Sequence, residues 1–124
     1  MRDDVIPVHT RSETVALRKD DIIYIESQLR LLIIHTIAKD YKYYGKLSDL
    51  MELLGEPFYR CHASLAINMD KLESASGCVL SMAGGHDIVL GRNKYQEARR
   101  TFLEYLRKSC EETKKCRRAP RIKD

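Results

Sequence analysis

The sequence has few cysteines and arranges none of them as a metal-binding pair. Its four cysteines, at positions 61, 78, 110 and 116 of 124 residues, form no C-x-x-C unit, which is the spacing that structural zinc sites commonly use. A chain of this length can build a hydrophobic core without disulfides. We therefore expect no metal site and no disulfide framework. We interpret Cys61 and Cys78 as small buried hydrophobic residues, with redox sensing by Cys61 as the alternative.

Long apolar runs are also missing. No stretch is long enough to cross a bilayer, which takes about 20 consecutive apolar residues in a helix. Residues 1–4 (MRDD) lack the apolar core of a secretory signal. The sequence therefore predicts a cytoplasmic protein that makes no contact with a membrane.

Groupings of residues that would indicate catalysis are equally scarce. We find no paired carboxylates, no phosphate-binding glycine loop and no ligand set with metal spacing. Cys61 and His62 are adjacent, but neighbours on a strand point to opposite faces and do not form the hydrogen bond that a cysteine nucleophile requires. We expect no enzyme, no cofactor and no small-molecule substrate.

The chain does contain an uneven distribution of charge. Residues 1–91 hold 10 Lys and Arg against 13 Asp and Glu, whereas residues 92–124 hold 12 against 5. A base-rich end attracts nucleic acid or an anionic surface, although it is also compatible with a solvated tail that only aids solubility. We predict one domain over residues 1–109 and a basic, mobile tail over residues 110–124.

Short runs of β-branched and aromatic residues, separated by polar turns, dominate the first two thirds of the chain. They predict strands over residues 5–9, 14–18, 22–26, 31–36 and 41–44 with no crossover helix among them, a pattern typical of antiparallel β structure. Later strands are expected over residues 72–75, 77–82 and 87–90. The pair Gly84-Gly85 suits a tight hairpin turn between the last two. The predicted fold class is mainly β, with about ten short strands.

Two segments show helical periodicity instead. Residues 47–54 repeat leucine at the spacing of one helical face and end at Gly55, so we expect a small helix that covers the sheet. Residues 93–109 carry an apolar stripe, and Asn93 suits the N-cap position. This second helix should follow the last strand directly.

The stretch from Phe58 to Met69 indicates a strand, a polar corner and a second strand. Its apolar side chains alternate with polar ones, as expected of strands with one exposed face. The exposed face is predicted to carry Arg60, His62, Ser64 and Asn68.

Four segments, in order and spanning roughly residues 5–106, resemble the LytTR family of bacterial DNA-binding domains. They are residues 22–27 (IIYIES), 47–50 (LSDL), 58–68 (FYRCHASLAIN) and 88–93 (IVLGRN). The string F-x-R-C-H-x-S-x-x-x-N is the most specific of them. The resemblance implies an elongated, mainly β domain that binds double-stranded DNA sequence-specifically as the output domain of a two-component response regulator. It also implies that loops enter successive major grooves and that the DNA is bent. A homodimer bound to repeated half-sites is one arrangement compatible with the resemblance.

The family's DNA-contacting segments correspond here to residues 27–30, 62–64 and 92–93. Arg92 would form two hydrogen bonds to guanine. For the first loop the alternatives are Gln28, which would pair with adenine, and Arg30, which would pair with guanine. At the corner, Ala63 would offer either a methyl contact to thymine or the backbone amides around it. The remaining polar and basic side chains would hold the DNA backbone: Arg60, His62, Ser64, Asn93, Lys94 and Arg99.

Two other functions stay open at this point. The same scaffold without a polar side chain at Ala63 would suit a protein-interaction or ligand-sensing β domain. The basic tail alone would suit non-specific binding of nucleic acid.

Overall fold

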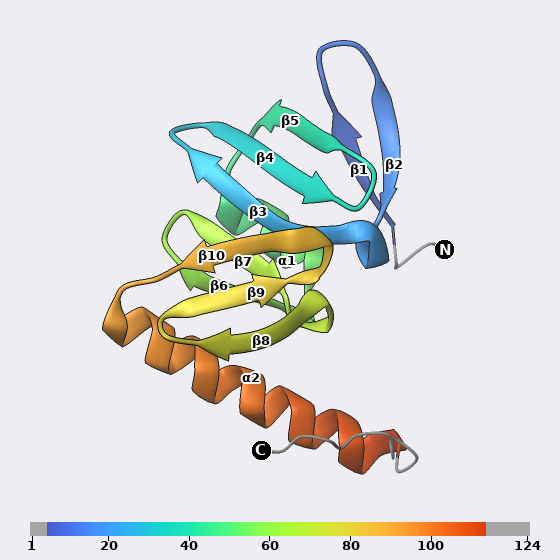
Figure 1. The fold of residues 1–124 in the computed structure, drawn as a ribbon. Helices are drawn as coiled ribbons and strands as arrows, with labels where there is room; N and C mark the ends of the chain where they lie inside the picture. The colour runs from blue at the N-terminus through green and yellow to red at the C-terminus, as the bar shows by residue number, and fades with distance from the viewer. Residues whose placement is uncertain (1–4, 114–124) are drawn as a thin grey trace.

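The computed structural model describes residues 5–113, and their side chains up to residue 108. Ten strands and two α-helices follow one another in this part of the chain, with short 3-10 turns between some of them (Figure 1). The strands are β1 (Val5–His9), β2 (Thr14–Arg18), β3 (Ile22–Gln28), β4 (Leu31–Thr36), β5 (Asp40–Tyr44), β6 (Phe58–His62), β7 (Leu65–Asn68), β8 (Leu72–Ser76), β9 (Val79–Met82) and β10 (His86–Val89). The helices are α1 (Leu47–Leu54) and α2 (Arg92–Thr113).

The strands form three antiparallel sheets. The largest has five strands in the order β5-β4-β3-β7-β6, a second has three in the order β10-β9-β8, and β1 pairs only with β2. The mainly β fold predicted from the sequence is therefore confirmed, including the hairpin turn at Gly84-Gly85, where both residues have positive φ.

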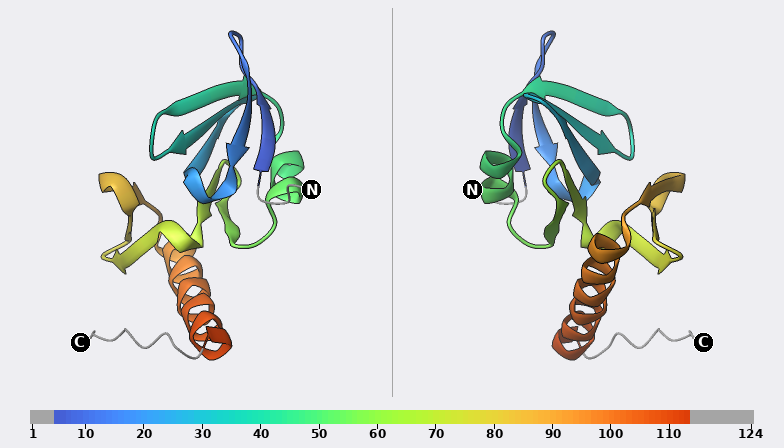
Figure 2. Two further views of the ribbon diagram at one scale, coloured as in Figure 1. Left: turned by 90° about the vertical axis from the view of Figure 1, so that its right-hand side faces the viewer. Right: turned by 90° about the vertical axis from the view of Figure 1, so that its left-hand side faces the viewer.

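Two hydrophobic clusters lie on opposite sides of the five-stranded sheet. One joins that sheet to α1 and the β1–β2 hairpin, and the other joins it to the three-stranded sheet and α2. Figure 2 shows this arrangement, with α1 and the three-stranded sheet on opposite sides of the central strands. Ile25 belongs to the first cluster and Ile23 to the second, so β3 contributes to both.

Helix α1 covers the sheet as predicted. Leu47, Leu50 and Leu54 are buried in the first cluster, and burial of each leucine side chain stabilises the fold by about 1.5–3 kcal/mol relative to exposure. Gly55 follows with φ 63°, and its N–H donates to the carbonyl of Met51 at 3.0 Å. The glycine therefore ends the helix in the left-handed region that it tolerates best.

Some sequence-based expectations differ from the structure. Asn68 is buried, with 1% of its surface exposed, and does not lie on an exposed face. Gly77 and Cys78 do not belong to a strand: they form the turn between β8 and β9, with φ 58° and 66°. Cys78 is accordingly only half-buried, whereas Cys61 is buried as expected.

The start and the end of α2 also differ from the prediction. Gly91, not Asn93, is the N-cap, because its carbonyl accepts the first helical hydrogen bond, from the N–H of Tyr95 at 2.8 Å. The helix continues to Thr113 instead of ending near residue 109. The rest of the basic tail, residues 114–124, lies outside the described residues.

Candidate nucleic-acid interface

Two of the three predicted DNA-contacting segments lie side by side. In the antiparallel pairing of β3 with β7, Glu26 lies opposite Leu65, so the end of β3 and the start of β7 share one edge of the sheet. The N–H of Ser27 donates to the carbonyl of Ser64 at 2.9 Å and joins them directly. The β3–β4 turn and the β6–β7 corner are thereby held together.

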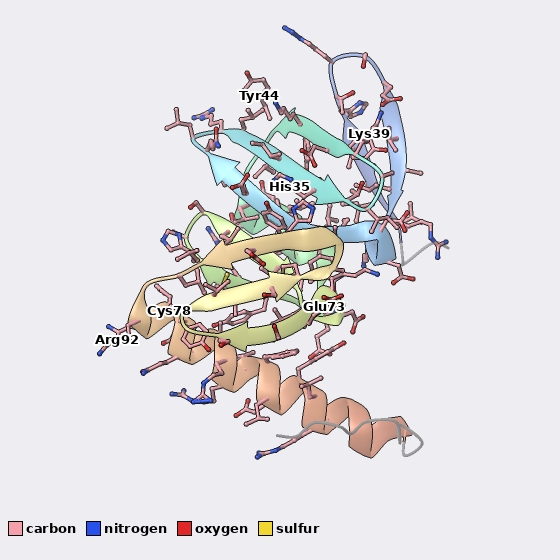
Figure 3. The ribbon with its side chains drawn as sticks, in the orientation of Figure 1. His35, Lys39, Tyr44, Glu73, Cys78 and Arg92 are labelled. Carbon is pink, nitrogen blue, oxygen red and sulfur yellow. The ribbon has the colours of Figure 1, made fainter. Side chains whose placement is uncertain are left out.

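The third segment approaches the same place from the other sheet. A hollow of about 340 Å³ is lined by the end of β3, the β6–β7 corner and the end of β10. Its lining residues are Glu26, Ser27, Gln28, His62, Ser64, Leu65, Val89 and Leu90. Arg92 follows two residues after Leu90 and projects outward in Figure 3. In Figure 1 all three connections lie on the left of the molecule.

We call this surface the turn edge and define it by residues 28–30, 62–64 and 92–93. Eight of the ten site residues predicted from the sequence lie on this edge or directly next to it: Gln28, Arg30, His62, Ala63, Ser64, Arg92, Asn93 and Lys94. Arg60 reaches the edge from β6, as described below, and Arg99 lies farther along α2.

The β6–β7 corner is held by hydrogen bonds among its own residues. The Nη2 of Arg60 donates to the carbonyl of Ala63 at 2.7 Å, and the N–H of Ser64 donates to Nδ1 of His62 at 3.2 Å. A neutral His62 ring therefore carries its proton on Nε2. Since both side chains are exposed, the corner presents a guanidinium and an imidazole N–H to solvent.

The β3–β4 turn consists of only two residues, Leu29 and Arg30, closed by the pairing of Gln28 with Leu31. The strand continues through Gln28, two residues beyond its predicted end, so the first loop is a tight hairpin turn. The backbone carbonyl of Arg30 accepts a hydrogen bond from the N–H of Gly45 at 2.9 Å. Gln28, Leu29 and Arg30 are all exposed.

Helix α2 begins at the turn edge and is anchored by buried residues just behind it. Tyr95 and Ala98 are buried in the second cluster, whereas Arg92, Asn93 and Lys94 are exposed. The first N–H groups of a helix have no intrahelical acceptor and carry partial positive charge. Residues 92–108 contain six Lys and Arg against two Glu, so this end of the turn edge is electropositive.

One carboxylate, that of Glu26, lies in the hollow of the turn edge and pairs with a histidine. The Nε2 of His35 lies 3.0 Å from Oε1 of Glu26, and Nδ1 of His35 lies 3.0 Å from Oδ1 of Asp40. The His35 ring also stacks on Tyr24, with 4.2 Å between centroids. Burial, together with the charges of Glu26 and Asp40, raises the pKa of the Tyr24 hydroxyl.

Cys61 and His62 do not form a catalytic pair. The Cys61 side chain is buried on one side of β6 with Sγ 3.8 Å from the carbonyl of Leu65, whereas His62 is exposed. Burial raises the pKa of the Cys61 thiol to about 11, so the thiol stays protonated near neutral pH. This disfavours both nucleophilic chemistry and thiolate-based redox sensing.

Two apolar residues of this region were missed by the sequence analysis. Leu29 and Val89 have 99% and 74% of their surface exposed. Leu29 lies within residues 27–30, of which only Gln28 and Arg30 were considered as base readers. Val89 was included among the apolar residues of a strand, although the alternation with buried Ile88 and Leu90 was a signal that its side chain faces outward.

Over the described part of the chain, no group of three or more His, Cys, Asp and Glu side chains is placed to hold a metal ion. Neither helix, as far as it is described, is long and apolar enough to cross a membrane.

Comparison with known proteins gives three findings. A family model described as the LytTr DNA-binding domain matches residues 12–102. Accessory gene regulator protein A of Staphylococcus epidermidis is 37% identical over 73 residues, which are 57% of this chain and 30% of that protein. The protein of the same name from Staphylococcus aureus strain N315 is 33% identical over the same length. The chain thus matches less than a third of the length of these curated relatives.

The third finding is structural. A solved LytTr DNA-binding domain from Bacillus cereus superimposes with a TM-score of 0.66 and 19% identity, covering 81% of this chain and 96% of that one. At this identity the likeness supports the fold alone.

Proposed function

The chain belongs to the LytTR family of DNA-binding domains, and we propose that it recognises a specific double-stranded DNA sequence as the output domain of a bacterial transcription regulator. The convergence of three connections on the turn edge carries this proposal. Residues 28–30, 62–64 and 92–93 are far apart in sequence, yet the hydrogen bond from Ser27 to Ser64 joins the first two segments, and Val89 and Leu90, just before the third, line the same hollow. Membership of the relatives in regulatory systems supports the role in transcription.

Base recognition is assigned to the side chains that project from these connections. Arg92 would place its guanidinium on the O6 and N7 of guanine, the commonest specific contact in the major groove. Gln28 and Arg30 flank the tip of the β3–β4 turn and would read adenine and guanine, respectively. Ala63 has only a methyl group and would contact a thymine methyl.

Phosphate contacts are assigned to the groups around these readers. The corner supplies the Arg60 guanidinium, the Nε2–H of His62 and the hydroxyl of Ser64. Helix α2 supplies Asn93, Lys94 and Arg99, together with the N–H groups of its first turn. Such contacts fix the position of a protein on DNA without reading its sequence.

The arrangement suits loops that enter successive major grooves, with the DNA bent toward the turn edge and a second copy bound on a repeated half-site. The β3–β4 turn and the β6–β7 corner project from paired strands of the five-stranded sheet, which hold them in place. Exposed cations on both sides of the edge would draw phosphates toward the protein and favour bending.

The test is a selection of bound duplexes from a random pool, followed by affinity measurements against salt concentration and competitor DNA. We expect a steep decrease of affinity with salt and at least tenfold preference for the selected site, which corresponds to about 1.4 kcal/mol. A steep salt dependence without preference would instead indicate non-specific binding through basic residues.

A ligand-sensing or protein-interaction role has one structural feature in its favour. A groove of about 730 Å³ lies between the β1–β2 turn and β5. Its lining includes Glu13, Lys39 and Tyr41, and Lys39 both pairs with Glu13 at 3.3 Å and lies over the Tyr41 ring. Failure to enrich any duplex would shift the assignment to this groove.

A further inference from the structure

We propose that Leu29 is a specificity-determining residue that recognises a thymine through its C5 methyl group. The inference rests on the proposed function and assigns to the β3–β4 turn an apolar contact in addition to the hydrogen bonds of its neighbours. Thymine is the only DNA base that presents a methyl group in the major groove.

The exposure of Leu29 is the first observation. Its side chain is 99% exposed, the highest value among the large hydrophobic residues that the structure describes. The fold gains no burial from this leucine. A substantial apolar side chain is instead left in water at the tip of a hairpin, where a polar residue would be favoured.

The backbone of Leu29 is the second observation. Its φ is 59°, in the left-handed region where side chains other than glycine, asparagine and aspartate are uncommon. Tight hairpin turns prefer asparagine or glycine at such positions for this reason. A leucine at this position therefore neither suits the backbone of the turn nor adds to the core. A binding partner explains its side chain better.

The position of Leu29 indicates which partner. It lies between Gln28 and Arg30, and the base of this hairpin is joined to the corner by the hydrogen bond from Ser27 to Ser64. A branched apolar group between two side chains that hydrogen-bond to bases matches the major-groove edge of A·T-containing sequence, where acceptors, donors and a methyl group alternate.

A protein partner or a second copy of the chain fits less well. Stable protein interfaces bury about 800 Å² on each partner. Leu29 lines a second hollow, of about 790 Å³, together with Gln28, Arg30, Leu31 and Tyr44. Of the other exposed large hydrophobic residues described, only Tyr44 lines this second hollow, whereas Leu53, Leu103 and Leu106 belong to the helices. One leucine and one tyrosine beside Gln28 and Arg30 do not make an apolar interface.

The experiment replaces each thymine of the selected site with deoxyuridine, which removes only the C5 methyl group. Affinities of the full chain are measured by fluorescence anisotropy. We expect one thymine at which the replacement weakens binding about three- to tenfold, as loss of one buried methyl group should. In Leu29→Ala this difference between thymine and deoxyuridine should disappear.

Two further variants keep the result interpretable. Leu53→Ala removes an exposed apolar group of α1, outside the turn edge, and should leave the thymine effect at that position intact. Leu29→Asn suits the left-handed backbone and provides a folded variant without the apolar group if Leu29→Ala proves unstable by circular dichroism.

The outcomes separate the two proposals. Specific binding with no thymine effect, or with an effect that persists in both Leu29 variants, would overturn the role of Leu29 and leave the proposed function standing. Absence of any sequence preference would overturn both. A loss of self-association in Leu29→Ala, measured by sedimentation without a change in the thymine effect, would identify Leu29 as a contact between copies and overturn its assignment to DNA.

Discussion

The side-chain amide of Asn68 donates a hydrogen bond to the carbonyl oxygen of Ile22 at 2.8 Å. Its Oδ1 also accepts a hydrogen bond from the N–H of Asp70 at 2.9 Å. The end of β7 is thereby attached to the start of β3, 46 residues earlier in the chain. Since Asn68 is almost completely buried, neither group can be compensated by water when its partner is removed.

Asn68→Ala should therefore lower the free energy of unfolding by about 2–3 kcal/mol, because it leaves the Ile22 carbonyl and the Asp70 N–H without this partner. Urea denaturation followed by circular dichroism measures the change. Asn93→Ala is the matched control, since Asn93 is exposed, and it should alter stability by no more than about 0.5 kcal/mol. Equal stability of the two variants would contradict the structural role of Asn68.

Arg92→Ala should weaken binding to the selected duplex by about 1–3 kcal/mol while preserving the fold, because it removes a two-pronged contact to guanine. Binding to random duplexes should decrease much less. Arg107→Ala removes the same charge about four turns later in α2 and should show no loss of preference. An equal loss on selected and random DNA would assign Arg92 to the phosphate backbone instead.

Removal of residues 114–124 should weaken binding to every duplex alike. The deletion removes six Lys and Arg and one Asp, and cations that contact phosphates add affinity without sequence preference. The measurement is the slope of log affinity against log salt concentration, which should become shallower. An unchanged slope would show that these cations do not contact DNA.

Stability should fall in alkaline solution as the buried Cys61 thiol begins to ionise. Its pKa is raised to about 11 in the folded chain, from 9.0 without burial. Below pH 9 the thiol is protonated in both states and its contribution to stability is complete; as the pH rises toward 11, only the unfolded state ionises and the contribution is lost. Burial also raises the pKa of Tyr43, which adds a loss in the same direction.

A comparison of variants isolates the contribution of Cys61. The difference in unfolding free energy between the wild type and Cys61→Ala should shrink by roughly 2 kcal/mol between pH 8 and pH 10.5. Val79→Ala, a half-buried change with no titrating group, should keep a constant difference from the wild type. A constant difference for Cys61→Ala as well would mean that the thiol ionises equally in both states.

Local patterns were sufficient to predict most of the fold. Alternating β-branched and aromatic residues located the strands, and the leucine spacing with Gly55 located α1 at its observed bounds. Asn68 was wrongly expected on an exposed face, because its side-chain amide bonds to a carbonyl of β3, a contact that no local pattern reveals. The N-cap of α2 was misplaced because Asn93 has the higher intrinsic preference for a cap, whereas buried Leu90, whose N–H donates to the carbonyl of Cys78 at 3.0 Å, makes the helix begin just after Gly91.

The candidate site was predicted as three separate segments, and their identification depended on the family resemblance. Their convergence required the pairing of β3 with β7 and the packing of β10 beside them, both of which are tertiary features. Leu29 was overlooked because only the polar side chains of residues 27–30 were considered as base readers. Its exposure follows from the two-residue length of the turn, which becomes evident only from the register of Gln28 opposite Leu31.

The hydrogen bond between Ser27 and Ser64 also has a consequence for the DNA. It holds the two connections that we propose to contact bases at a constant interval, so they cannot adjust independently to an altered operator. One base pair inserted between the positions that they contact would rotate one position by about 34° around the duplex relative to the other, given roughly 10.5 base pairs per helical turn. The protein would then lose both contacts together, and operator length would be recognised as strictly as operator sequence.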